Sequence, residues 1–267
     1  MSFDLAAYLG RIGLSDVSPD AAGLHALQEA HMRSVPFENF DPLLGRVPSL
    51  EVGDVFAKIV GQGRGGYCFE QNGLFEAALK SVGFSTRRML ARVRMRMGPE
   101  GARSHLALRV DLDGEAWLAD AGFGGPGSLH PLRLDRSEPQ ETPSGIFRLV
   151  EDAGRGETVL ERRDGQDWLQ LYAFDGARVT DQEIAAANHF CATWSEAPFG
   201  FHLLAGAWAG PLRYGLFDRN LTVSGPEGVE ARELESLEEF SGLVTDALGI
   251  SLDPASLERA WERIGGV

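Results

Sequence analysis

The protein has 267 residues, of which 43% are hydrophobic, and a chain of this kind can form one large or two to three small packed units. Its formal net charge of −14 argues against nucleic acid as a partner, and no stretch approaches the ~20 apolar residues of a membrane span. The N-terminus lacks the pattern of an export signal, and the two cysteines, Cys68 and Cys191, lie far apart. We therefore expect a cytoplasmic protein with reduced thiols, no nucleic-acid partner and no membrane partner.

The first third of the sequence has helical periodicity. Apolar residues between positions 3 and 12 share one helical face. Ser18 followed by Pro19 predicts the N-cap and first residue of a second helix. The prolines and Asn-Phe-Asp of residues 35–42 predict a loop, and residues 52–60 predict another helix.

The middle third has the period of two that is typical of strands. This period begins at Thr86 and predicts a strand over 86–97. Residues 104–110 and 116–120 predict two more strands, joined by a turn at Asp113-Gly114. Further predicted strands cover 146–150, 158–162 and 168–174.

Helical signals return in the last third. Thr180 with Glu183, and Ser236 with Glu239, have the spacing of helix capping boxes, and a strand pair is predicted between them at 212–223. The fold class is therefore α+β. The predicted domains are a helical domain of residues 1–85, a β domain of residues 86–178 and a mixed α/β domain of residues 179–267.

Cys68 is the first candidate for chemistry. It follows the glycine-rich stretch 61–66, and a helical pattern begins there and ends at Gly83, so Cys68 is expected at a helix N-terminus. That position favours the thiolate, which is the nucleophilic form of cysteine. A buried structural cysteine is the ordinary alternative, and it is our interpretation of Cys191, which lies between Phe190 and Trp194 in a predicted helix.

The turn at Asp113-Gly114 decides which side chains meet across the predicted hairpin. A two-residue turn places Ala107 opposite Asp120. His105 is then the diagonal neighbour of Asp120 on the same face. A four-residue loop would place His105 directly opposite Asp120, and only a loop with an odd number of residues would separate the two side chains.

A carboxylate beside an imidazole favours the imidazolium, and an imidazolium beside a cysteine stabilises its thiolate. The sequence therefore predicts a triad of Cys68, His105 and Asp120. The other histidines have no partner predicted in this way, and no spacing indicates a metal site. They are His25, His31, His130, His189 and His202.

Two further segments are candidates for ligand binding. Residues 122–127 contain four glycines directly after Asp120, and they leave room for a ligand although they lack the Lys-Ser/Thr ending of a phosphate-binding P-loop. Seven arginines between residues 87 and 109 form a basic stretch. This stretch either receives a phosphorylated ligand or is a solvated strand face.

Three segments resemble the arylamine N-acetyltransferase family in sequence, order and spacing. They are VPFEN (35–39), RGGYCFEQN (64–72) and WLADAGFG (117–124). Weaker likeness covers most of residues 1–190. One difference is that a leucine follows His105, whereas the family more often has arginine or methionine at that position. This difference bears on which acceptor substrates are preferred.

The resemblance implies an N-terminal helical bundle, a central β-barrel and a C-terminal α/β lid, with a triad like that of transglutaminases and cysteine proteases. Cys68, His105 and Asp120 match the family's triad, and Glu38 and Arg64 match a structural ion pair. The implied substrate pocket consists of Phe37, Tyr67 and Phe123. The implied contacts to coenzyme A are Gly122, Phe123, Gly124, Gly125 and Gly127.

The implied reaction moves an acetyl group from acetyl-CoA, through acetyl-Cys68, to the nitrogen of an arylamine or hydrazine or to the oxygen of an N-hydroxyarylamine. No metal is implied. Two enzymatic alternatives are an amide synthase of the same fold that acts on carrier-bound acyl chains, and a cysteine hydrolase. A binding module without activity is less favoured, because one hairpin register brings together two of the three residues a triad needs.

Overall fold

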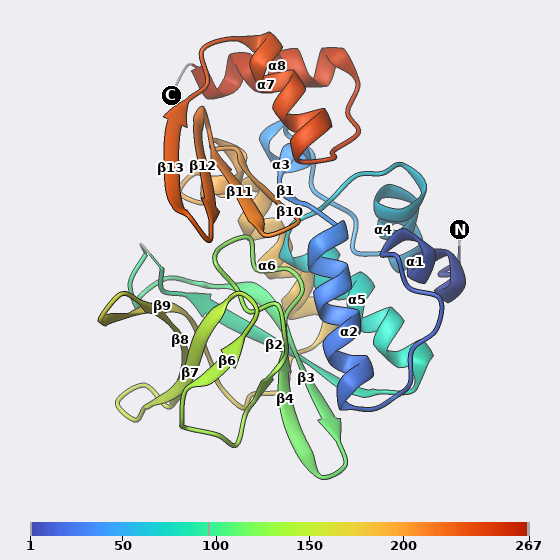
Figure 1. The fold of residues 1–267 in the computed structure, drawn as a ribbon, viewed down its shortest axis with the longest axis vertical. Helices are drawn as coiled ribbons and strands as arrows, with labels where there is room; N and C mark the ends of the chain where they lie inside the picture. The colour runs from blue at the N-terminus through green and yellow to red at the C-terminus, as the bar shows by residue number, and fades with distance from the viewer. Residues whose placement is uncertain (1, 96, 266–267) are drawn as a thin grey trace.

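The structure is a computed structural model that describes residues 2–95 and 97–265. It has an α+β fold, which confirms the class predicted from the sequence. In Figure 1 the N-terminal helices lie on the right, a large antiparallel sheet lies below and to the left, and a second sheet with the C-terminal helices lies above. Within the described ranges, no helix is long and apolar enough to cross a membrane.

The N-terminal region is helical as predicted, with one boundary in a different place. The second helix begins at Ala21 and not at Pro19, because Asp20 is the N-cap and its Oδ1 accepts a hydrogen bond from the Gly23 amide at 2.8 Å. The prediction of Ser18 as N-cap was therefore wrong. The helices are α1 (Leu5–Arg11), α2 (Ala21–Ser34), α3 (Phe40–Leu43), α4 (Val52–Phe56) with a π-helical turn (Ala57–Gly61), and α5 (Cys68–Val82).

The middle of the chain forms an eight-stranded antiparallel sheet that curls into a nearly closed barrel. Its strand order is β5-β4-β3-β2-β9-β8-β7-β6. Apolar side chains including Ala107, Phe147 and Leu171 fill its interior. The strands are β2 (Ser85–Val93), β3 (Arg103–Leu112), β4 (Glu115–Ala119), β5 (Leu132–Arg133), β6 (Gln140–Thr142), β7 (Gly145–Asp152), β8 (Glu157–Asp164) and β9 (Asp167–Phe174).

The β3–β4 hairpin has the two-residue turn that the sequence predicted. Leu112 pairs with Glu115, and the turn residues Asp113 and Gly114 have φ values of 51° and 81°. Positive φ at both central positions is the property of a type I′ turn, which matches the twist of the flanking strands. The same register pairs Leu108 with Ala119.

β2 is shorter than predicted. The strand ends at Val93 and not at residue 97. Its pairing register with β3 shifts between Ala91 and Arg92, and Arg92 and Val93 then pair with β9. The amides of Arg94 and Met95 both donate to the carbonyl of Leu171, which ends the ladder. Arg96, the next residue of the predicted strand, lies outside the described residues.

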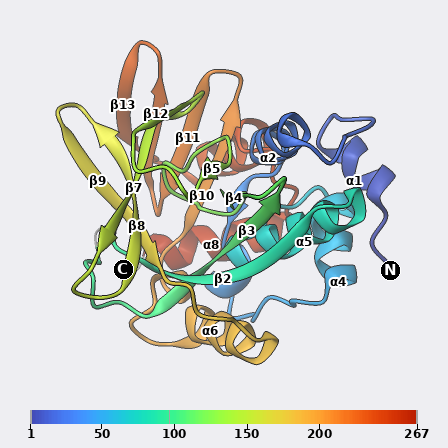
Figure 2. The same cartoon turned by 90° about the horizontal axis from the view of Figure 1, so that it is seen from below.

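The C-terminal third begins with α6 (Asp181–Thr193), which packs against β3 (Figure 2). A five-stranded sheet follows, with the order β1-β10-β11-β12-β13, and α7 and α8 cover it (Figure 1). Its strands are β1 (Phe37–Glu38), β10 (Leu204–Ala209), β11 (Leu212–Phe217), β12 (Asn220–Gly225) and β13 (Gly228–Glu233). The remaining elements are a 3-10 turn (Pro198–Gly200), α7 (Leu237–Gly242), a π-helical turn (Leu243–Ala247) and α8 (Pro254–Gly265).

The short strand β1 joins this second sheet to the N-terminal region. Phe37 pairs with Gly206 of β10 on one side and forms a parallel bridge with Gly66 on the other. The second sheet therefore contains residues from both ends of the chain. The division into three domains at 85/86 and 178/179 stays a prediction.

Candidate active site

Cys68 is the first residue of α5, as the glycine-rich stretch before it indicated. Its side chain is buried, and the thiol donates to the carbonyl of Ser104 on β3 at 3.7 Å. Glu70, two residues later, accepts a hydrogen bond from the Tyr67 amide and so closes the first turn of the helix. The thiol thus lies where the helix dipole favours its deprotonation.

His105 and Asp120 form a buried pair next to this cysteine. His105 lies within β3, and Asp120 follows the last residue of β4. The His105 Nε2 atom lies 2.7 Å from Asp120 Oδ2. Because Nε2 is engaged by the carboxylate, Nδ1 is the ring nitrogen left for the Cys68 thiol.

Burial and mutual charge set the protonation of the three groups. Burial lowers the pKa of His105, but the Asp120 carboxylate outweighs this effect and raises that pKa to about 10. Burial raises the pKa of Asp120, and His105 then holds it below its usual value. Burial also raises the pKa of the Cys68 thiol, and the hydrogen bond and charge of His105 oppose that rise. Loss of Asp120 would therefore weaken the imidazolium that favours the thiolate.

Asn72, one turn after Cys68, fixes the helix against both strands. Its Nδ2 atom donates to the Leu106 carbonyl at 2.6 Å and to Asp120 Oδ1 at 2.8 Å. Its Oδ1 atom accepts from the amide of Ala121 at 2.9 Å. The sequence analysis did not single out Asn72, although its spacing of four residues from Cys68 places both on one face of the helix.

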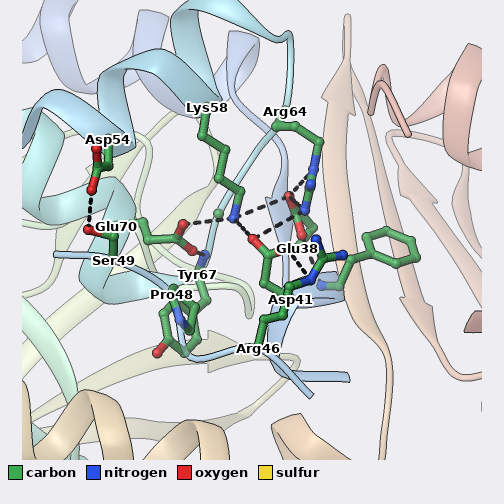
Figure 3. Close-up of polar contacts among 12 residues, drawn as sticks. Glu38, Asp41, Arg46, Pro48, Ser49, Asp54, Lys58, Arg64, Tyr67 and Glu70 are labelled. Carbon is green, nitrogen blue, oxygen red and sulfur yellow. Dashed lines mark hydrogen bonds and ion pairs between the residues drawn. The ribbon is translucent and has the colours of Figure 1, made fainter. Parts of the chain in front are cut away.

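A buried ionic cluster lies beneath the start of α5 (Figure 3). Its members are Glu38, Asp41, Lys58, Arg64 and Glu70. The Glu38–Arg64 ion pair that the resemblance implied is present, with 2.8 Å between Glu38 Oε1 and Arg64 Nη2. Three carboxylates therefore share the buried Lys58 and Arg64, with the exposed Arg46 3.7 Å from Asp41 at the edge, and the cluster is stable only while each charge keeps its partners.

Lys58 is the centre of the ionic cluster (Figure 3), and the sequence analysis missed it. Its Nζ atom lies 2.7 Å from both Glu70 Oε1 and Asp41 Oδ2. Lys58 comes from the π-helical turn, so it connects the helix of the nucleophile to the segment that carries Phe37 and Glu38. Burial raises the pKa of Glu70 to about 7, against the opposing effect of Lys58.

A small pocket of about 30 Å³ lies between α2, α5, the loop after Asp120 and the strands β10 and β11. Phe37, Phe123 and Gln71 of α5 form part of its wall. The assignment of Phe37 and Phe123 to a substrate pocket stays a prediction. Tyr67 does not line this pocket. Its ring is fully buried against Phe69 and Phe199, and its hydroxyl donates to Asn188 of α6. A role of Tyr67 in the substrate pocket stays a prediction.

Packing within the protein accounts for several glycines of residues 122–127. A Cβ atom at Gly122 would lie 2.9 Å from the Cys68 Cα atom. A Cβ at Gly124 would lie 2.7 Å from the Phe37 ring, and one at Gly125 would lie 2.6 Å from the Phe123 ring. A contact between this loop and coenzyme A stays a prediction.

Five of the seven arginines in the basic stretch form ion pairs. Arg88 pairs with Glu76 and Asp181, and Arg94 pairs with Asp152 and Glu157. Arg92, Arg103 and Arg109 also have acidic partners. These arginines are thus neutralised within the protein and do not form a phosphate site.

Two of the remaining histidines have carboxylate partners that no hairpin register predicted. His202 Nδ1 lies 2.7 Å from Asp218 Oδ2, and His130 Nε2 lies 3.0 Å from Glu29 Oε2. These partners come from loops and from α2, which a hairpin count does not reach. In the part of the chain that the structure describes, no group of three or more His, Cys, Asp or Glu side chains is arranged to hold a metal ion.

Comparisons with known proteins agree with this geometry. A family model described as N-acetyltransferase matches residues 20–257. The arylamine N-acetyltransferase of Mycolicibacterium smegmatis is 35% identical over 259 residues, which are 94% of each chain. The arylamine N-acetyltransferase / N-hydroxyarylamine O-acetyltransferase of Salmonella typhimurium is 38% identical over 206 residues, which are 76% of this chain and 73% of that one.

The fold is also similar to a solved structure with its coenzyme. The structure of Mycobacterium marinum arylamine N-acetyltransferase in complex with CoA matches with a TM-score of 0.92 and 30% identity, over 97% of this chain and 99% of that one. A buried thiol at a helix N-terminus beside a His–carboxylate pair is typical of enzymes that form an acyl-cysteine. With the sequence and fold matches, the chain belongs to the arylamine N-acetyltransferase family.

The first prediction concerns Asp120. In Asp120→Asn the pKa of His105 should fall by about 1 to 3 units, because the opposite charge is lost. The imidazolium then disappears at a lower pH, and the pKa of Cys68 rises. We expect the inflection of the pH–rate profile for alkylation of Cys68 by iodoacetamide to move upward by about one pH unit or more. An unchanged inflection would contradict the proposed link between the three groups.

The second prediction concerns Lys58, one of only two lysines in the sequence. Lys58→Met leaves three carboxylates with Arg64 and the more exposed Arg46, and we expect a loss of about 3 kcal/mol in the free energy of unfolding. Glu70 binds a proton more readily in the folded than in the unfolded protein, so folded stability falls as pH rises towards 7. Without Lys58 the pKa of Glu70 rises further, and the added loss should be larger at pH 8 than at pH 6.

Urea unfolding of both lysine variants provides the control. Lys80 is 55% exposed and pairs with Glu76, which keeps Arg88 as a second partner. We expect Lys80→Met to lose about 0.5 kcal/mol or less. The retained charge of Lys58→Arg should restore most of the stability. A loss in Lys58→Met no larger than that in Lys80→Met would show that the ionic cluster does not depend on Lys58.

Proposed function

We propose that this chain transfers acetyl groups from acetyl-CoA to the nitrogen of arylamines or hydrazines, and to the oxygen of N-hydroxyarylamines, through acetyl-Cys68. The observation that supports this most is the buried Cys68 at the start of α5 with the His105–Asp120 pair at 2.7 Å beside it. Membership of the arylamine N-acetyltransferase family supports the choice of donor and acceptor.

In the first half of the proposed reaction, the proton of the Cys68 thiol moves to Nδ1 of His105, and the sulfur attacks the thioester carbon. A carbon–sulfur bond to Cys68 forms and the bond to the coenzyme sulfur breaks. The coenzyme leaves as a thiolate and takes the proton from His105. Asp120 keeps Nε2 engaged throughout, so that Nδ1 is the nitrogen that exchanges the proton.

In the second half, the amine attacks the carbonyl carbon of acetyl-Cys68. A nitrogen–carbon bond forms, the bond to the Cys68 sulfur breaks, and one amine proton moves to His105. This restores the thiolate and imidazolium. An arylamine is neutral at pH 7 and so has a free electron pair, which suits a pocket with the aromatic walls Phe37 and Phe123.

The proposed reaction also bears on coenzyme binding and location. The residues proposed to contact coenzyme A are Gly122, Phe123, Gly124, Gly125 and Gly127, and the support is their position directly after Asp120. Because the reaction needs Cys68 as a free thiol, it suits a reducing compartment such as the cytoplasm. Burial raises the pKa of Cys191 to about 12, so the second thiol should not compete.

The test is the intact mass of the protein after mixing with acetyl-CoA. We expect one acetyl adduct, because Cys68 is the one activated thiol, and we expect an arylamine to discharge it. Cys68→Ala should form no adduct, whereas Cys191→Ala should form it as the wild type does. Peptide mapping should place the adduct on Cys68.

Sensitivity to hydroxylamine distinguishes a thioester from an acetylated amine, and the latter is limited to Lys58, Lys80 and the N-terminus. Acetyl-enzyme that persists in Cys68→Ala would overturn the mechanism. A wild-type adduct that water discharges as fast as the amine does would favour a hydrolase.

A further inference from the structure

The two cysteines of the sequence meet at one backbone atom, although they lie far apart along the chain. The Cys68 thiol donates to the carbonyl oxygen of Ser104 at 3.7 Å, and the Cys191 thiol donates to the same oxygen at 3.5 Å. The two sulfur atoms are therefore separated by at most the sum of these distances. Both side chains belong to one buried apolar cluster, and both thiols are free.

Ser104 is an irregular position of β3. Consecutive residues of β2 pair with His105 and Arg103, so Ser104 between them has no partner among the described residues of β2. Such an extra residue is a β-bulge, which changes the direction of the groups around it. The bulge lies next to His105, and the helices of the two cysteines, α5 and α6, both pack on this strand. The strand thus brings the two thiols together.

The last turn of α6 carries Cys191 at a place where the helix can move. Trp194, the C-cap of α6, is 44% exposed. The helix is anchored one turn earlier by Asn188, whose side chain donates to the Pro48 carbonyl and accepts from the Tyr67 hydroxyl. Helix ends open at little cost in free energy. A displacement of this last turn alone can therefore bring the sulfurs to the ~2 Å of a disulfide.

The two thiols differ in reactivity. Burial raises the pKa of both, and at Cys68 the hydrogen bond and the charge of His105 oppose this rise. Oxidants react with the thiolate and not with the thiol. Cys68 is therefore oxidised first, and Cys191 remains as a thiol that can react with the product.

From this arrangement we propose that Cys191 is a resolving cysteine, which forms a reversible disulfide with Cys68 when a peroxide oxidises the protein. The inference goes beyond the proposed function, because it requires the two thiols and no acetyl transfer. In the disulfide state Cys68 cannot accept an acyl group. The same bond protects Cys68 from irreversible oxidation to the sulfinic acid.

The chemistry has two steps. The Cys68 thiolate attacks one oxygen of hydrogen peroxide, a sulfur–oxygen bond forms, the oxygen–oxygen bond breaks, and the second oxygen leaves as water with a proton from His105. The Cys191 sulfur then attacks the sulfur of this sulfenic acid. A sulfur–sulfur bond forms, the sulfur–oxygen bond breaks, and the hydroxyl group leaves as water with the proton of Cys191. The two thiols lose two electrons, and the peroxide gains them.

The test is a count of free thiols in the denatured protein after treatment with a slight molar excess of hydrogen peroxide. In the wild type we expect the count to fall from two to none, and dithiothreitol to restore both. The intact mass should fall by two hydrogen atoms, because the disulfide forms within one chain. A tryptic digest without reductant should contain residues 65–80 joined to residues 179–213.

Three variants separate the roles of the two thiols. In Cys191→Ala we expect a sulfenic acid on Cys68 that dimedone labels, and excess peroxide should convert it to a sulfinic acid that dithiothreitol does not reduce. Cys191→Ser should behave in the same way, and thermal unfolding shows which of the two keeps the fold. Cys68→Ala should retain its one thiol under the slight excess of peroxide. The wild type should bind little dimedone.

Two results would overturn the inference. A wild-type thiol count that falls only to one, with as much dimedone bound as in Cys191→Ala, would show that Cys191 does not reach Cys68. A disulfide-linked dimer on electrophoresis without reductant would show that the joined peptides come from separate chains. Acetyl transfer is measured separately on the untreated protein, so a failure of the proposed function does not affect this test.

Discussion

The side-chain amide of Asn72 is the interaction on which the proposed active site depends. It is completely buried, and its hydrogen bonds reach β3, the Asp120 side chain and the backbone that follows Asp120. These contacts fix how α5 approaches the barrel, and α5 carries the nucleophile in its first turn. A buried amide that loses such partners costs about 1 to 3 kcal/mol for each unsatisfied group, so no other rotation or register of α5 is accessible at similar free energy.

The first turn of α5 lies between two buried polar networks. On the side of the barrel, Asn72 and His105 satisfy the two oxygens of Asp120, and this carboxylate stays ionised although it is buried. On the opposite side, Lys58 binds Glu70, which caps the helix. Apolar packing alone tolerates small shifts, whereas hydrogen-bonded charges at fixed distances do not. The position of the thiol is therefore specified by polar contacts, and their desolvation is compensated by opposite charge.

The sequence predicted the parts of the site that local rules determine. A two-residue turn at Asp113-Gly114 sets the hairpin register, and the glycines before Cys68 indicate that a helix begins there. No local sequence pattern predicted the contacts between segments that are far apart in the sequence. Lys58 looks like any surface lysine until the chain folds, and β10 consists mostly of small residues whose pattern indicates neither a strand nor a helix. The His202–Asp218 pair shows that a histidine beside a carboxylate does not by itself make a reactive site. A thiol must also lie beside the pair.

The two residues of β1 limit how the pocket can change shape. The Phe37 backbone pairs with Gly206 and Gly66, and the neighbouring Glu38 side chain belongs to the ionic cluster. A shift of this pocket wall would break sheet pairing and separate buried charges at once. The shape of the pocket is therefore set by backbone contacts that leave little freedom. Among the described side chains that line this pocket, Arg213 is the one that carries a charge.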